Sequence, residues 1–127
     1  NDGKIEEEYQ PKVESKIEIK KENLDAIFRG MFLVTTGPRG TLRSYFKDFP
    51  VNVAAKSGTA QQSSKRSEHT TFVAFAPLED PQISVCVIIP FGNGTTGPAP
   101  KVAKAAISEY LKLDYESELK SYDTLLH

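Results

Sequence analysis

A lysine, two hydroxyl side chains and a glycine directly follow an apolar run near the middle of this 127-residue chain. Apolar residues alternate along residues 51–55, which predicts a β-strand, and Lys56, Ser57, Gly58 and Thr59 continue it. A strand that presents a cation, two hydroxyls and accessible backbone is well suited to bind an anion. The pattern therefore predicts one wall of a cleft that takes a carboxylate-bearing substrate.

A second pattern of possible chemical interest is the G-x-G-x-x-G sequence at residues 92–97. It follows an expected strand and precedes an expected helix, which is the setting of a dinucleotide-binding fingerprint. However, Pro98 and Pro100 delay the helix until after the last glycine, so its N-terminus would not face a pyrophosphate. We interpret this stretch as a flexible strand-to-helix loop and expect no bound cofactor.

The remaining single residues and short matches carry less weight. Two S-x-x-K sequences, at residues 44–47 and 117–120, have the spacing of a serine and its lysine base, but such short matches arise by chance. His69 and His127 have no partners at metal-ligand spacing, so we expect no metal site. Cys86 lies in the apolar run 83–89, which predicts a buried structural thiol rather than a nucleophile.

Composition limits the possible classes of protein. An apolar content of 39% and a formal charge of -1 predict that residues 1–127 form one globular domain or part of one. The near-neutral balance gives no electrostatic reason to expect nucleic-acid binding. No apolar run approaches the ~18 residues of a membrane helix, so we expect no membrane contact from this segment. Because the sequence does not begin with Met, we expect it to be part of a longer protein.

The first half of the chain predicts a strand, a helix and a loop. Val13, Ile17 and Ile19 alternate with charged residues, which predicts a short half-exposed strand. An apolar stripe at helical spacing follows and predicts a core-packed helix that ends at the breaker 35–38. The stripe consists of Leu24, Ile27, Phe28, Met31 and Val34. The irregular residues 39–50 predict a loop or short helical turn against the core.

The second half predicts a sheet of the α+β class. Strand-like runs occupy residues 51–61, 70–77 and 82–90, and the short link 78–81 predicts that the last two form an antiparallel hairpin. These two runs are apolar at both odd and even positions, which predicts a sheet covered by helices on both faces. One covering helix is expected at residues 101–113, followed by a weaker helix or frayed tail at 114–127.

The run K-S-G-T-A-Q at residues 56–61 resembles the third motif of the transpeptidase domain of class B penicillin-binding proteins. The resemblance continues in order along nearly the whole chain. Residues 1–4 and 9–13 are similar to the stretch after the family's second motif, 23–31 to a helix with a Gly-Met pair, 71–77 to an aromatic strand ending in Ala-Pro, and 97–100 to the segment before the C-terminal helix. This implies the C-terminal part of a penicillin-binding protein transpeptidase fold, which the serine β-lactamases share.

The resemblance also implies a role for each motif residue. Lys56 would hydrogen-bond the serine of the second motif and attract the carboxylate of a substrate or β-lactam. Ser57 and Thr59 would present hydroxyls to the cleft, and Thr59 would contact the carboxylate. The backbone N–H of Thr59 would form half of the oxyanion hole. Gly58 would let the acyl group approach the backbone, because a Cβ would crowd it.

Two motifs of that family are missing from this chain. The nucleophile and base come from an S-x-x-K far upstream and the second motif is S-x-N, but no S-x-N occurs here and Ser44 lies only 12 residues before Lys56. We therefore expect the chain alone not to be acylated, and the remainder of the transpeptidase domain to be its partner. The resemblance implies peptidoglycan cross-linking by a D,D-transpeptidase that uses D-Ala-D-Ala stem peptides and binds β-lactams. It also implies a location at the extracytoplasmic face of a bacterial membrane, with an anchor outside this sequence.

Two alternatives remain open at this stage. A class D β-lactamase or β-lactam sensor domain shares the fold, although the Gly30-Met31 pair and the Ala60-Gln61 continuation favour the biosynthetic enzyme. A non-catalytic interaction module could also keep the fold without the chemistry. The deacylation rate of the intact protein distinguishes the first alternative from a transpeptidase. The presence of S-x-x-K and S-x-N motifs upstream of this sequence would favour an enzyme over the interaction module.

Overall fold

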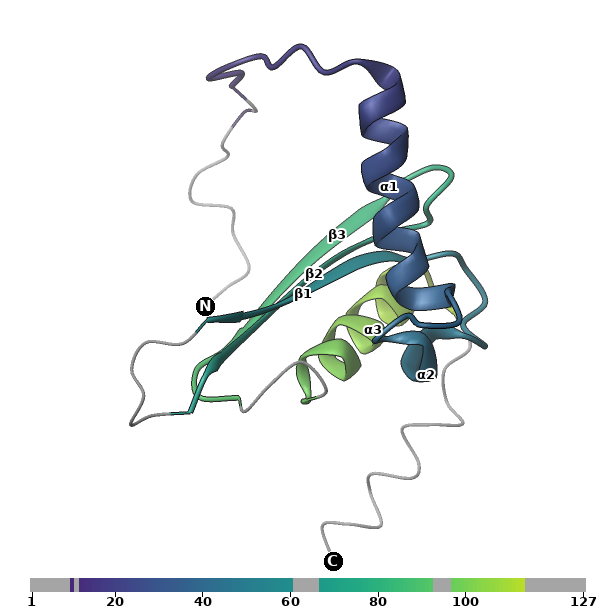
Figure 1. The fold of residues 1–127 in the computed structure, drawn as a ribbon, viewed down its shortest axis with the longest axis vertical. Coiled ribbons are helices and arrows are strands. Elements are labelled where there is room, and N and C mark those ends of the chain that lie inside the picture. The colour runs from purple at the N-terminus through teal and green to yellow at the C-terminus, as the bar shows by residue number, and fades with distance from the viewer. Residues whose placement is uncertain (1–9, 11, 61–66, 93–96, 114–127) are drawn as a thin grey trace, which may run out of the picture.

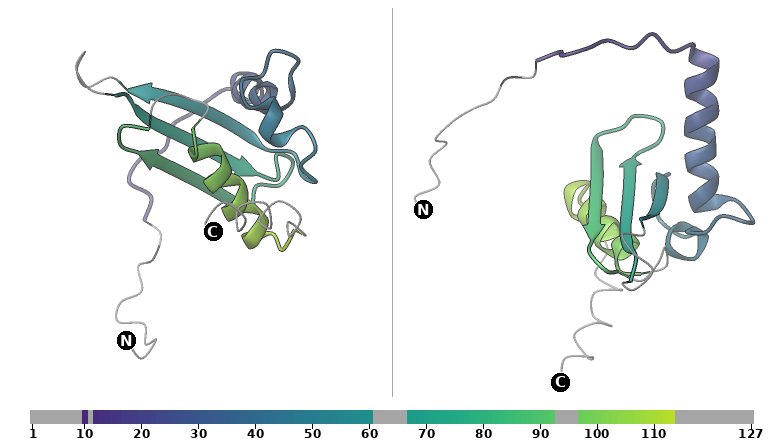
Figure 2. Two further views of the ribbon diagram at one scale, coloured as in Figure 1. Left: turned by 90° about the horizontal axis from the view of Figure 1, so that it is seen from below. Right: turned by 60° about the vertical axis from the view of Figure 1, so that its left-hand side comes forward.

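A computed structural model describes residues 10, 12–60, 67–92 and 97–113. In chain order its elements are α1 (Lys21–Thr36), α2 (Arg43–Phe46), β1 (Ala54–Ala60), β2 (His69–Ala76), β3 (Ile83–Ile89) and α3 (Ala99–Tyr110). The strands form an antiparallel sheet in the order β1-β2-β3, with α1 and α3 on opposite sides of it (Figures 1 and 2). The predicted α+β class, the hairpin and the two covering helices are confirmed.

The register of the strands decides which residues share a face of the sheet. Ser57, Phe72 and Val87 lie side by side on the three strands, and so do Lys56, Val73 and Cys86. Because side chains alternate along a strand, these two rows point to opposite faces. The Phe72 row faces α3 and the main core, while the Lys56 row lies on the face toward α1.

The main core lies between α3 and the sheet. It is built from small and large apolar side chains: Leu42, Phe46, Val53, Ala55, Phe72, Ala74, Ala76, Ala99, Ala103 and Ile107. The rings of Phe46 and Phe72 stack in parallel with centroids 6.4 Å apart, which attaches α2 to the middle of β2. Ala99 and Ala103 have small side chains, so α3 can approach the strands closely. Full burial of one Phe side chain stabilises the folded state by about 1.5–3 kcal/mol.

Helix α1 covers the opposite face only in part. Phe28 packs edge-on against Phe75, with ring centroids 5.1 Å apart. Core packing was expected to account for the whole apolar stripe of α1, but Ile27 is 53% exposed and the other stripe residues are half-buried. The expectation failed because helical periodicity identifies one side of a helix, whereas burial depends on what lies against that side.

Three further expectations were wrong. Residues 12–20 form no strand, since Val13 and Ile17 are largely exposed and nothing in the described part of the chain pairs with them. Helix α3 begins at Ala99 rather than at residue 101, because prolines are tolerated in the first helical turn. Cys86 is exposed rather than buried, since it lies in the Lys56 row, away from α3.

Some expectations fall outside the described residues. These are the resemblance at residues 1–4, 9 and 11, Gln61 at the end of the K-S-G-T-A-Q run, the second S-x-x-K at 117–120, His127, the tail 114–127 and the middle of the glycine-rich stretch at 93–96. Among the described helices, none combines the length and apolar content required to cross a bilayer.

Candidate functional site

The residues of the K-S-G-T motif occupy the middle and end of β1, at one edge of the described sheet. Lys56 and Thr59 are exposed, whereas Ser57 is only 8% exposed because it lies beside Phe72 on the core face. The Lys56 ammonium group donates a hydrogen bond to the carbonyl oxygen of Ser57. A positive charge and a hydroxyl are thus accessible along this edge, on opposite faces of the strand.

The beginning of β1 is attached to two neighbouring segments. The Thr35 hydroxyl, at the end of α1, donates a hydrogen bond of 2.6 Å to the carbonyl oxygen of Val53. On the other side, the N–H of Leu78 donates to the carbonyl oxygen of Asn52 at 2.8 Å. The backbone just before the motif is therefore fixed between α1 and the link that joins β2 to β3.

A side-chain contact strengthens the second attachment. The Asn52 amide donates a hydrogen bond to the carboxylate of Glu79. This bond, together with one from the backbone of Glu79 itself, lowers the pKa of Glu79 from its ordinary value of 4.5. The hydrogen bond from the Asn52 amide is therefore stronger when the Glu79 carboxylate is charged.

Gly58 faces a close neighbour on the adjacent strand. Gly58 pairs with Thr71, and a Cβ built on Gly58 would overlap the Oγ1 atom of Thr71. The family resemblance implies that this glycine leaves room for an acyl group. The structure adds a separate reason for glycine at this position, because Thr71 already occupies the space above it.

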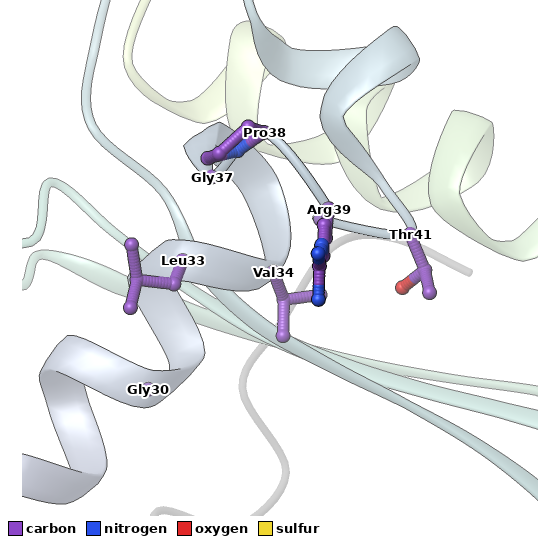
Figure 3. Close-up of a pocket in the computed structure, with 8 residues that line it drawn as sticks. Gly30, Leu33, Val34, Gly37, Pro38, Arg39 and Thr41 are labelled. Carbon is purple, nitrogen blue, oxygen red and sulfur yellow. The ribbon is translucent and has the colours of Figure 1, made fainter.

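Two apolar hollows border α1 rather than the motif. The first has a cavity volume of about 410 Å³ and lies between the last turns of α1 and the loop that follows (Figure 3). It is lined by Gly30, Leu33, Val34, Gly37, Pro38, Arg39, Gly40 and Thr41. The second, about 340 Å³, is formed by Met31 together with Val73, Cys86 and neighbouring residues of β2 and β3. Gly30 therefore lines the first hollow and Met31 lines the second.

The S-x-x-K match at residues 44–47 belongs to another surface. Ser44 and Lys47 line an open hollow with Pro38, Gly40 and Arg43, and no residue of β1 contributes to it. The structure therefore does not bring this serine and lysine together with the motif strand. The residues that position that strand, Thr35 and Thr71, were missed by the sequence analysis, since contacts between distant residues leave no local pattern.

The sheet is antiparallel, carries the K-S-G-T strand at one edge and lies between two helices. This arrangement is of the transpeptidase type. The family model described as "Penicillin binding protein transpeptidase domain" matches residues 2–109. The chain belongs to the penicillin-binding protein transpeptidase family, and its similarities are to the class B members.

Three relatives illustrate the similarity. Penicillin-binding protein 2B of Streptococcus pneumoniae strain R6 is 30% identical over 116 residues, 87% of this chain and 17% of its own length. Its solved structure superposes with a TM-score of 0.71 at 28% identity, covering 87% of this chain and 19% of that one. Peptidoglycan D,D-transpeptidase MrdA of Escherichia coli K12 is 34% identical over 98 residues, 66% of this chain and 15% of its own length. PBP2 of Pseudomonas aeruginosa, solved in complex with WCK 5153, gives a TM-score of 0.68 at 35% identity, covering 84% and 24% of the two chains. The chain thus spans less than a fifth of the length of the curated relatives that it matches.

Proposed function

We propose that this chain is the C-terminal portion of a class B transpeptidase domain and forms one wall of a serine acyl-transfer site. The full protein would cross-link peptidoglycan as a D,D-transpeptidase and would bind β-lactams at the same site. The observation that carries this proposal is the K-S-G-T sequence on an accessible sheet edge, in a chain that belongs to this family. The relative named as a peptidoglycan D,D-transpeptidase supports the choice of reaction.

The reaction requires a serine supplied by another part of the protein. Its Oγ attacks the carbonyl carbon between the two D-Ala residues of a stem peptide, the amide bond breaks, and the serine proton passes to the departing amine of D-Ala. An amine of a second stem peptide then attacks the ester carbonyl carbon, the bond to the serine Oγ breaks, and a proton from the amine passes to that Oγ, so the serine is released and the cross-linking amide forms. Each attack places a negative charge on the carbonyl oxygen, so a donor held in advance lowers both barriers.

The residues of β1 would act on the charges of this reaction. The N–H of Thr59 would donate to the developing oxyanion, and its exposed hydroxyl would donate to the terminal carboxylate of the substrate. Ser57 lies on the same face of the strand as Thr59 and would contribute its hydroxyl from a more buried position. Lys56 would exchange its hydrogen bond to the Ser57 carbonyl for one to the second-motif serine, while its charge attracts the carboxylate. Gly58 would keep the backbone open to the acyl group.

The remainder of the transpeptidase domain would cover the exposed apolar residues around α1. Leu33, Val73 and Ile88 are 48%, 42% and 64% exposed, and the two hollows beside Gly30 and Met31 lie on the same α1 side. Exposed apolar side chains that gather on one face of a sheet are expected at an interface. The greater length of the relatives, of which this chain spans 17% and 15%, supports a partner from the same polypeptide. The assembled domain would lie at the extracytoplasmic face of a bacterial membrane.

Labelling of the intact protein with a fluorescent penicillin tests the proposal. We expect covalent labelling of the wild type, a loss of about 100-fold or more in labelling rate for Lys56→Ala, and no labelling of the isolated 127-residue chain. Lys47→Ala is the matched control, because it removes an exposed lysine from the S-x-x-K match at 44–47. Slow release of the label distinguishes a transpeptidase from a β-lactamase. Labelling that depends on Lys47 and not on Lys56 would overturn the proposal.

A further inference from the structure

The turn after β3 folds back onto the first residue of β2. The N–H of Phe91 donates a hydrogen bond of 3.3 Å to Nδ1 of His69, and the two rings are in contact with centroids 4.8 Å apart. Phe91 has a φ of 56°, in the left-handed region that non-glycine residues seldom adopt. The contact therefore depends on a specific backbone conformation at Phe91.

The same turn also contacts the second residue of β2. A Cβ built on Gly92 would lie 2.8 Å from Oγ1 of Thr70, so the backbone of Gly92 rests directly against this buried threonine. His69 and Thr70 are consecutive in a strand, and their side chains point to opposite faces of the sheet. The turn thus holds the beginning of β2 from both faces.

The beginning of β2 is what supports the end of the motif strand. His69 pairs with Ala60, and Thr70 pairs with Thr59. Since β1 has a strand neighbour on only one side within the described sheet, the position of Thr59 depends on Thr70 across the ladder. Phe91 and Gly92 therefore contact the two residues of β2 that pair directly with the end of the motif strand.

We propose that Phe91 and His69 form a clasp that holds the end of β1 in register and so positions Thr59 for its contacts with the substrate. This role deepens the proposed function and rests on it. Phe91 and His69 act as positioning residues, because they contact β2 and the turn rather than the reacting atoms. A misplacement of a binding group by about 1 Å can lower a rate by up to 100-fold, so loss of the clasp affects chemistry at a distance.

Three variants of the intact protein separate the parts of the clasp. Phe91→Asn removes the ring but keeps a residue that tolerates the left-handed conformation. His69→Phe keeps a ring and removes the Nδ1 acceptor, while His69→Asn keeps an acceptor and removes the ring. Tyr110→Asn is the matched control, since it removes another exposed aromatic ring from the end of α3, outside the sheet.

The first measurement is the acylation rate constant with benzylpenicillin and with its methyl ester. We expect Phe91→Asn and His69→Phe to slow the free acid by about tenfold and the ester by less, because the ester lacks the carboxylate that Thr59 contacts. His69→Asn should retain more of the rate than His69→Phe, and Tyr110→Asn should match the wild type. A wild-type rate in Phe91→Asn, or an equal loss for both compounds with a lower unfolding temperature, would overturn the clasp.

The second measurement does not require acylation. Amide hydrogen exchange across Ala54–Ala60 should become faster in Phe91→Asn than in Tyr110→Asn, because the end of β1 opens more often. If wild-type protein is not acylated at all, the proposed function fails, and the exchange experiment still decides whether the clasp holds β1. Unchanged exchange in both His69→Phe and Phe91→Asn would contradict the clasp independently of activity.

Discussion

The hydroxyl of Thr35 donates a hydrogen bond to the carbonyl oxygen of Val53 at 2.6 Å, and the two residues are 0% and 2% exposed. Thr35 lies in the last turn of α1, and Val53 immediately precedes β1. This bond connects residues 18 apart in sequence and, together with the bond from the Leu78 N–H to the Asn52 carbonyl, holds the backbone where the motif strand begins. The helix that resembles the family's Gly-Met helix thus also positions the strand that carries Lys56.

Replacement of Thr35 by Val should destabilise the protein by about 1–3 kcal/mol, because the buried Val53 carbonyl loses its donor while the shape of the side chain is nearly kept. Thr35→Ser is the matched control, since it retains the hydroxyl and loses only a methyl group. Unfolding temperatures of the intact variants measure the difference. Equal stability of the Val and Ser variants would show that the hydrogen bond contributes nothing.

The positions of the main elements were predictable because each has a strong local signal. The apolar stripe of α1 repeats at the period of a helix, and β2 and β3 are short, continuous apolar runs bounded by turn-forming residues. The alternation at Val13 and Ile17 is just as regular, yet no strand forms there in the described chain. A strand needs a partner for its backbone groups, and a sequence pattern does not say whether one is within reach.

Replacement of Gly58 by Ala should destabilise the protein by about 1–3 kcal/mol, since the new methyl group overlaps Oγ1 of Thr71. Either Thr71 must change rotamer or β1 and β2 must move apart. The double variant Gly58→Ala with Thr71→Ala removes the overlapping atom and should recover most of the lost stability. Unfolding temperatures of the two single variants and the double variant test this.

The same double variant separates the two reasons for a glycine at position 58. If the glycine serves only to accommodate Thr71, penicillin acylation should recover together with stability. Recovery of stability without recovery of acylation is the outcome we expect, because a Cβ at position 58 would also crowd the acyl group. Full recovery of both would assign Gly58 a structural role alone.

Phe72 should be among the most sensitive positions in the core. It is 1% exposed, stacks on Phe46, and lies beside Ser57 on the next strand. Phe72→Ala should cost about 3–5 kcal/mol, while Phe72→Leu, which fills most of the space, should cost markedly less. Chemical denaturation of the intact protein measures both. An Ala variant as stable as the Leu variant would show that the surrounding core closes over the lost ring.

The motif residues could be identified from the sequence, but their surroundings could not. The order K-S-G-T is local, so one strand carries all four residues whatever the rest of the chain does. The contact of Thr71 with Gly58 and that of Phe91 with His69 depend on strand register and on the path of a turn. From the sequence, His69 suggests only a possible metal ligand, because nothing local predicts its contact with the ring of Phe91.

Glu79 should make the attachment of β1 dependent on pH. Its pKa is lowered below 4.5 chiefly by the hydrogen bond from Asn52, so the folded state favours the charged carboxylate. The stabilising contribution is therefore fully present above pH 4.5 and is lost as the pH falls through the lower pKa of the folded state. Glu79→Gln, which cannot ionise, should unfold at a slightly lower temperature than the wild type at pH 7. At pH 3 that difference should shrink.

Two controls connect this effect to the contact itself. Asn52→Ala removes the principal cause of the shift, so Glu79→Gln should have little further effect in that background. Asp80→Asn changes the adjacent exposed carboxylate and should not reproduce the pH-dependent difference. Unfolding temperatures measured from pH 7 to pH 3 test all four variants. A difference between wild type and Glu79→Gln that grows as the pH falls would reverse the expected sign and refute the assignment.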